Sequence, residues 1–219
     1  MNLDLRGWAS SGGRTLLARP VAAPPWVALN GPYAMGGLLA ALFDLGDEPC
    51  ELTQPPFGTN MAYRKAMFEK YGLFRTDLGP SPDKNTPRPN EDTEFGRRLL
   101  AAGERLRYEP SAVVYHSLPE NRLCKDYILT WHFDLGRAVV REMGRRPEIL
   151  GIPRPYLTLL KAVVITAPEK ILWWLFASNP KRRFYCKARV WEAAGQIVEI
   201  YRRWFVKKSS PEIQVEYFQ

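Results

Sequence analysis

The chain has 219 residues, of which 46% are hydrophobic and 25% are charged, and its formal net charge is +8 at pH 7. It is long enough for one large domain, or one domain with an appendage, with an ordinary globular core. The three cysteines, Cys50, Cys124 and Cys186, are widely spaced without a Cys-x-x-Cys pair. This spacing argues against a disulfide framework or a structural zinc site and is compatible with a reducing cytosol.

Positive charge is concentrated in the C-terminal part of the chain. Residues 1–119 contain 13 Lys and Arg and 13 Asp and Glu, whereas residues 120–219 contain 18 and 10. Five of the seven tryptophans also lie in this second part. Basic residues mixed with aromatic ones suit a membrane surface with anionic lipids, or nucleic acid. A solvated helical surface explains the charge equally well.

Few regular elements are predicted before residue 61. A short strand is expected around residues 16–17, followed by an irregular, proline-rich link. The apolar residues 33–46 predict a short helix or apolar segment that ends at Gly46, and QPPFGTN at residues 54–60 predicts a loop.

A helix and a loop are predicted next. Residues 61–72 carry apolar side chains at helical spacing, and Gly72 suits the position after a helix C-terminus. Residues 78–89 contain four prolines and predict a loop.

The stretch NEDTEFGRRLLAAG predicts a second helix, which begins at residue 91. Asn90 suits its N-cap, and the helix dipole favours the acidic residues of the first turn. Phe95, Leu99 and Ala102 fall on one face, and Gly103 supplies a stop.

The stretch ERLRYEPSAVVYH, residues 104–116, predicts two short strands divided by Pro110. His116 is therefore expected at a strand end, while Glu91 and Asp92 stand at a helix start behind a loop. Functional sites are commonly built at such positions.

From residue 121 onward the chain is expected to be helical. Leu123, Tyr127, Trp131 and Leu135 recur every four residues and predict the apolar face of one helix. The last helix is predicted to have an apolar and a charged face. The apolar face comprises Val190, Trp191, Ala194, Ile197, Val198, Tyr201 and Phe205, and the charged face comprises Arg189, Glu192, Gln196, Glu199 and Arg203.

No segment reaches the roughly 20 apolar residues that a membrane-spanning helix needs. Residues 156–177 come nearest, but Lys161, Glu169 and Lys170 interrupt them and Pro168 breaks or kinks the helix. They predict two short apolar helices that lie on a surface without crossing it. The N-terminal residues have no apolar core of a signal peptide, so none is expected.

Taken singly, the acidic residues and His116 have ordinary explanations. Carboxylates at a helix N-terminus usually compensate the dipole, and a lone histidine is more often a hydrogen-bonded structural residue than a ligand. Asp92 and Glu94 are two positions apart on a helix, so they point to different faces and are poorly placed to chelate one metal ion.

In combination, the stretches FGTNMAYRKAMFEKYGLF (57–74) and NEDTEFGRRLLAAGERLRYEPSAVVYH (90–116) resemble the second half of a family-2 glycosyltransferase of the GT-A fold. That family has a Gly–Asn loop with a downstream Arg, a Gly-x-Phe, an acidic helix start with an Arg one turn later, and a segment ending in His. The resemblance is specific over residues 57–116, looser over 20–136, and says little about the remainder.

The resemblance implies an α/β fold. Residues 1–119 would form an incomplete GT-A-like, Rossmann-like sheet, the C-terminal half of such a domain. From their composition and periodicity, residues 120–219 are expected to form a mainly α-helical, basic and Trp-rich region associated with a membrane surface.

The resemblance also implies roles for individual residues. Asp92, accompanied by Glu91, falls where such enzymes place the general base, and His116 falls where a histidine completes a divalent metal site. The loop residues Gly58, Thr59 and Asn60 would line the donor sugar and acceptor. Arg64 and Arg98 occupy recurring arginine positions, for which a structural or phosphate-orienting role is expected.

These residue types fit inverting glycosyl transfer, an in-line displacement at the anomeric carbon. A carboxylate activates the acceptor hydroxyl, and Mg²⁺ or Mn²⁺ neutralises the departing diphosphate. The substrates would be a nucleotide-sugar donor and a glycan or lipid-linked acceptor.

The family's nucleotide-binding first half, which ends in an Asp-x-Asp metal loop, has no counterpart in the sequence, where no Asp-x-Asp occurs. Residues 11–26 resemble the segment after that loop. We therefore expect weak or no transfer by this chain alone, and association with a missing half or with further copies, because an incomplete sheet exposes an edge.

Three interpretations follow from the sequence. The first is a glycosyltransferase by descent, peripheral at the cytoplasmic face of a membrane. The second is a non-catalytic membrane-surface or partner-binding remnant of such an enzyme. The third, a nucleic-acid binder, depends on charge alone and is disfavoured, because the basic residues alternate with acidic ones along amphipathic helices.

Overall fold

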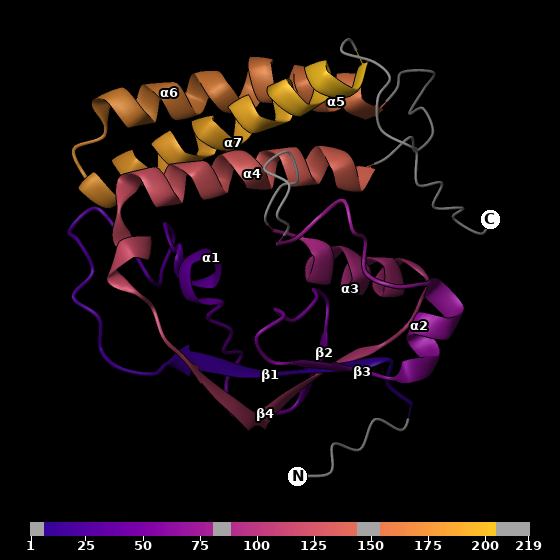
Figure 1. Ribbon diagram of the computed structural model, residues 1–219. Coiled ribbons are helices and arrows are strands. Elements are labelled where there is room, and N and C mark those ends of the chain that lie inside the picture. The colour runs from indigo at the N-terminus through magenta and orange to yellow at the C-terminus, as the bar shows by residue number, and fades with distance from the viewer. Residues whose placement is uncertain (1–6, 81–88, 144–153, 205–219) are drawn as a thin grey trace.

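The computed structural model describes residues 7–80, 89–143 and 154–204, and it has a mixed α/β architecture, which confirms the α/β part of the prediction. In Figure 1 the sheet lies at the bottom, with α1 and α3 above it, α4 above these, and α7 and α6 at the top. The strands are β1 (Ser10–Leu17), β2 (Cys50–Leu52), β3 (Met61–Tyr63) and β4 (Leu106–His116). The helices are α1 (Gly36–Ala40), α2 (Lys65–Tyr71), α3 (Glu91–Ala101), the 3-10 turn η1 (Glu120–Leu123), α4 (Lys125–Met143), α5 (Arg154–Leu160), the π-helical turn η2 (Lys161–Thr166), α6 (Ala167–Phe176) and α7 (Pro180–Trp204).

The sheet has the strand order β2-β4-β1-β3. The central strands β1 and β4 are parallel, and each edge strand pairs antiparallel with its neighbour. The predicted division of residues 104–116 at Pro110 is wrong, because β4 is one strand. A register shift replaces the break: Gly13 pairs with Glu109 but Arg14 pairs with Val113. Proline has no N–H to donate to a ladder, and such an irregularity tolerates it.

Two further boundaries differ from the prediction. Residues 61–72 do not form one helix, because Met61–Tyr63 pairs with β1 as a strand before α2 begins. Strand pairing is a tertiary interaction and here outweighs the local helical spacing. The segment after residue 33 forms only the short helix α1, which ends where Ala41 adopts a left-handed conformation, before Gly46.

Helix α3 confirms its predicted bounds and most of its apolar face. Phe95 and Leu99 are fully buried, whereas Ala102 follows the last turn and is exposed. Phe95 stacks on Phe68 of α2 with a centroid distance of 4.8 Å. These rings belong to a core cluster beneath α3 that also includes buried residues of β2 and β4.

A second core cluster joins α1 to the helical region. Leu39 of α1, Ile128 of α4 and Ala188 of α7 are all fully buried in it. It therefore draws residues from both sides of the predicted boundary after residue 119.

The predicted apolar faces of α4 and α7 are largely wrong. In α7, Ile197 and Tyr201 are 36% and 58% exposed, whereas Glu192 and Glu199 of the predicted charged face are 6% and 2% exposed. In α4, Tyr127, Trp131 and Leu135 are only partly buried, and the buried side includes His132, Asp134 and Arg137. Phe205 lies outside the described residues.

The physical reason is that α4 and α7 bury paired charges where they meet. Glu199 accepts hydrogen bonds from Arg137 at 3.1 Å and from Arg141 at 2.7 Å. The helices approach so closely that a Cβ on Gly195 would lie 2.0 Å from the carbonyl oxygen of Phe133, and one on Gly136 would meet the carbonyl oxygen of Glu192 at the same distance. Pairing lowers the cost of burying the charges, which hydrophobic periodicity does not anticipate.

Residues 154–176 form a continuous helical run beside α7, with the π-helical turn η2 between α5 and α6. Pro168 lies in the first turn of α6, where it is tolerated. Within the described part of the chain, no helix has the length and apolarity needed to cross a bilayer.

Candidate functional site

The carboxylate of Asp92 and the loop at residues 57–60 are in direct contact. Asp92 stands in the first turn of α3, and its Oδ2 accepts the Gly58 N–H at 2.6 Å. Its Oδ1 accepts the N–H and hydroxyl of Thr93 at 2.6 and 3.0 Å. A Cβ on Gly58 would approach Asp92 Oδ2 to 2.8 Å, so glycine permits this close approach.

The rest of the loop is attached to the irregularity between β1 and β4. The Asn60 side-chain amide donates to the carbonyl oxygens of Arg14 and Ala112, at 2.9 and 2.8 Å. Ala112 lies in the interval that the register shift leaves unpaired, Arg14 is the first residue of β1 after the shift, and Asn60 donates to both carbonyls. Thr59 Oγ1 lies 3.5 Å from Thr15 Oγ1 on β1. The loop is thus held from β1, β4 and α3.

Glu91 is half-buried next to Asp92. Burial, followed by repulsion from the Asp92 carboxylate, raises the pKa of Glu91 above its ordinary value. Its carboxyl group packs against Gly79, whose absent side chain and positive φ of 84° make room for it. Burial and then Asp92 also raise the pKa of Tyr63, the last residue of β3. The surroundings of Asp92 therefore favour neutral forms of both neighbours.

Asn90 does not cap α3 as predicted. Its φ is 90°, and its side chain makes no capping hydrogen bond but donates to Glu142 of α4 at 3.2 Å. Glu142 also accepts a hydrogen bond from Arg97 at 2.6 Å. The start of α3, with Asp92, is thus tied to the end of α4.

The two arginines expected near the loop have different surroundings. The Arg98 side chain donates to the Tyr71 and Leu73 carbonyl oxygens, at 2.5 and 3.2 Å, and pairs with Glu94 at 2.6 Å. These contacts link α3 to the end of α2, which is a structural role. The side chain of Arg64 is exposed at the start of α2, while its main-chain N–H donates to Ala9.

His116 ends β4 opposite Leu17, and its Nδ1 is buried without a hydrogen-bond partner among the described residues. A divalent cation such as Mg²⁺ or Mn²⁺ takes several oxygen ligands. Within residues 7–80, 89–143 and 154–204, no three His, Cys, Asp or Glu side chains converge as a metal site. Among the described residues, His116 therefore does not belong to such a group.

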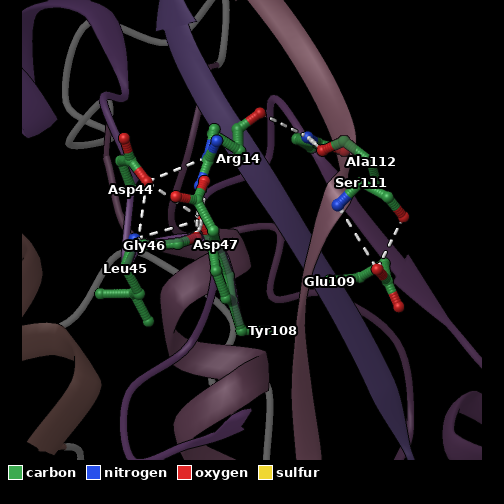
Figure 2. Close-up of polar contacts among 10 residues, drawn as sticks. Arg14, Asp44, Leu45, Gly46, Asp47, Tyr108, Glu109, Ser111 and Ala112 are labelled. Carbon is green, nitrogen blue, oxygen red and sulfur yellow. Dashed lines mark hydrogen bonds and ion pairs between the residues drawn. The ribbon is translucent and has the colours of Figure 1, made fainter. Parts of the chain in front are cut away.

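A cluster around Arg14 was not singled out by the sequence analysis (Figure 2). Arg14 on β1 pairs with Asp44 at 3.0 Å and Asp47 at 2.7 Å, and it donates to the Gly46 carbonyl oxygen. The fully buried Tyr108 places its hydroxyl 3.3 Å from both Arg14 Nε and Asp44 Oδ1. Two features of the sequence could have indicated this cluster. Arg14 lies within a Ser/Gly-rich strand, and the acidic Asp44 and Asp47 follow an apolar segment. The cluster fixes the segment after α1 to the sheet.

Searches against models of protein families, curated proteins and solved structures gave no match for this chain.

Proposed function

We propose that this chain is the acceptor side of a sugar-nucleotide-dependent inverting glycosyltransferase and that Asp92 is its general base. The small sheet is proposed to be related to the sheet of the GT-A fold. One observation carries the proposal: the Asp92 carboxylate at the start of α3 holds the Gly58 N–H of the loop at 2.6 Å. The two stretches that carry the family resemblance thus meet at one exposed place, through residues 34 positions apart in the sequence.

The chemistry proposed for Asp92 is proton removal. An ionised carboxylate oxygen has about two acceptor positions, and Oδ2 uses one for Gly58. The other accepts the proton of the acceptor hydroxyl as its oxygen bonds to the anomeric carbon. The bond from that carbon to the diphosphate breaks at the same time, and the nucleoside diphosphate leaves with the electron pair. The divalent metal of the family is assigned no step, because no three candidate ligands lie together among the described residues.

The proposed acceptor is a lipid-linked or surface polysaccharide precursor, and the proposed location is the cytoplasmic face of a membrane. The support is the exposed apolar surface of α5 and α6 beside basic residues of α7.

A transfer assay tests the proposal. The purified chain is incubated with labelled nucleotide sugars, Mn²⁺ and a panel of oligosaccharide and polyprenyl-phosphate acceptors, and binding to the same acceptors is measured in parallel. Asp92→Asn is compared with Asp126→Asn, an exposed carboxylate in the first turn of α4. Loss of a general base lowers the rate by about 10²–10⁴-fold, so only Asp92→Asn should lower transfer.

Calorimetry addresses the expectation that this chain lacks the donor side. Weak or no binding of sugar nucleotides is expected, and any transfer should then need an added partner. Tight, Mn²⁺-dependent donor binding would contradict that expectation. Absence of both transfer and acceptor binding, or equal loss in both variants, would contradict the assignment of Asp92.

A non-catalytic remnant of such an enzyme is the second candidate. The observation in its favour is that Asp92, Asn60 and Arg98 each use hydrogen bonds to hold the fold together. Acceptor binding that Asp92→Asn leaves unchanged, without transfer under any condition, would favour this candidate.

A further inference from the structure

The helical run at residues 154–176 presents large apolar side chains to solvent. Six of them are at least half exposed: Leu160, Val164, Ile165, Leu172, Leu175 and Phe176. Phe176, at the end of α6, is 76% exposed. Contiguous exposed apolar surface of this kind marks an interaction site more often than isolated exposed residues do.

The charges beside this surface are almost all positive. Residues 156–187 contain six Lys and Arg and a single acid, Glu169. Lys181, Arg182 and Arg183 lie in the first turn of α7, where the helix dipole disfavours cations and where no acidic residue occurs. Arg183 donates to the carbonyl oxygens of Trp174 and Leu175, which fixes this basic turn beside the end of α6.

Tryptophans lie at the junction of the apolar and basic surfaces. The Arg182 guanidinium lies 3.4 Å from the ring centroid of Trp173, which is 38% exposed. Lys187 lies 5.4 Å from the Trp174 ring and 5.1 Å from that of Trp191. Trp is enriched where an apolar environment meets water, and nearby cations suit anionic headgroups.

We infer that residues 154–176 lie flat in the headgroup region of a membrane containing anionic lipids, with the exposed apolar side chains of α5, η2 and α6 in the acyl layer and Lys161 and the first turn of α7 on lipid phosphates. At about 1.5 Å per residue the run is about 34 Å long, and its exposed face forms one side while α7 covers the other. The phosphates of anionic lipids would neutralise the basic first turn of α7, which favours a lipid surface as the occupant. The inference specifies the membrane contact of the proposed function but does not require glycosyl transfer.

Vesicle flotation of the full chain tests the inference. Vesicles of phosphatidylcholine alone are compared with vesicles in which about one third of the lipid is phosphatidylglycerol. We expect binding to the anionic vesicles at low salt, weaker binding to the neutral ones, and release at high salt.

The apolar variant is Leu172→Ser with Phe176→Ser. Its matched control is Leu73→Ser with Tyr115→Ser, whose side chains are 74% and 67% exposed on other elements. The apolar variant should bind at least about tenfold more weakly, and the control should bind as the wild type does. Circular dichroism checks that all variants are folded.

The charge variant is Lys161→Gln with Lys181→Gln, and its control is Lys65→Gln with Lys125→Gln, all exposed. About tenfold weaker binding is expected of the charge variant on anionic vesicles only. Lack of vesicle binding by the wild type, or equal loss in variants and controls, would overturn the inference. So would a dimer, seen by sedimentation, that the apolar variant abolishes, because the surface would then join two copies. A failed transfer assay with soluble acceptors leaves these outcomes unaffected.

Discussion

Helices α3 and α7 are both amphipathic in sequence, yet only α3 buries the residues that its periodicity predicts. Helix α3 packs Phe95 and Leu99 on an aromatic and aliphatic core, and its buried acid, Glu94, pairs with Arg98 of the same helix. Helix α7 packs against α4 on one side and against α5, η2 and α6 on another. Its charged residues Glu192 and Glu199 are buried against α4, and the apolar Tyr201 is exposed. Periodicity therefore locates the buried face of a helix with one apolar neighbour, but not of one packed between two partners.

The largest expected effect concerns the buried charges of α7. Glu199→Gln removes the negative charge that faces Arg137 and Arg141, and breaking a buried pair costs about 3–5 kcal/mol. Chemical denaturation should show this loss. The control Glu69→Gln, in an exposed pair with Lys65, should cost less than about 1 kcal/mol. Equal small effects would mean that the α4–α7 charges are solvated, and the contrast with α3 would disappear.

Because α4 and α7 approach closely, replacing a glycine between them by alanine is predicted to destabilise the protein, the opposite of the usual effect in a helix. Gly→Ala within a helix normally stabilises by about 0.5–1 kcal/mol. Gly195→Ala should instead destabilise by about 3 kcal/mol, because its Cβ would meet backbone atoms of Phe133. Gly37→Ala in α1, whose Cβ would lie 3.2 Å from the Phe57 ring and 3.7 Å from the Leu42 carbonyl oxygen, is the matched control. A stabilising Gly195→Ala would contradict this packing of the helices.

In the sheet region, Asn60 is predicted to be the chief polar support of the loop. Asn60→Ala would leave the carbonyl oxygens of Arg14 and Ala112 without their donor, and such a loss costs about 2 kcal/mol. Thermal unfolding measures it, with the exposed Asn121→Ala as control. An unchanged stability would show that water replaces the amide and that the irregularity does not depend on the loop.

The smallest expected effect is a gain in stability at Glu91. Because folding raises its pKa above 4.5, its contribution to stability is present below that pH and is lost as the pH rises through the folded-state pKa. Glu91→Gln, neutral throughout, should raise Tm by about 2 °C at neutral pH, and the gain should vanish at acidic pH. The exposed Glu48→Gln should show no such trend. A gain that does not change with pH would contradict the role of burial.

The sequence by itself determined the mixed α/β class, the bounds of α3, the loop at residues 54–60 and the helical character of the C-terminal part. The α/β class was expected from the family resemblance. The other three follow from local signals: an acidic first turn, apolar residues at helical spacing, or consecutive turn formers. It also directed attention to Asp92 and Gly58, which meet at 2.6 Å.

Only the tertiary structure decided the features that depend on partners distant in sequence. Pairing with β1 made a strand of residues 61–63, and the irregularity beside Pro110 kept β4 continuous and made Asn60 a structural donor. The orientation of α7 was decided by charge pairing with α4. Periodicity reports how apolar each face of a segment is, but not which partner each face meets, and a buried ion pair needs both partners in place.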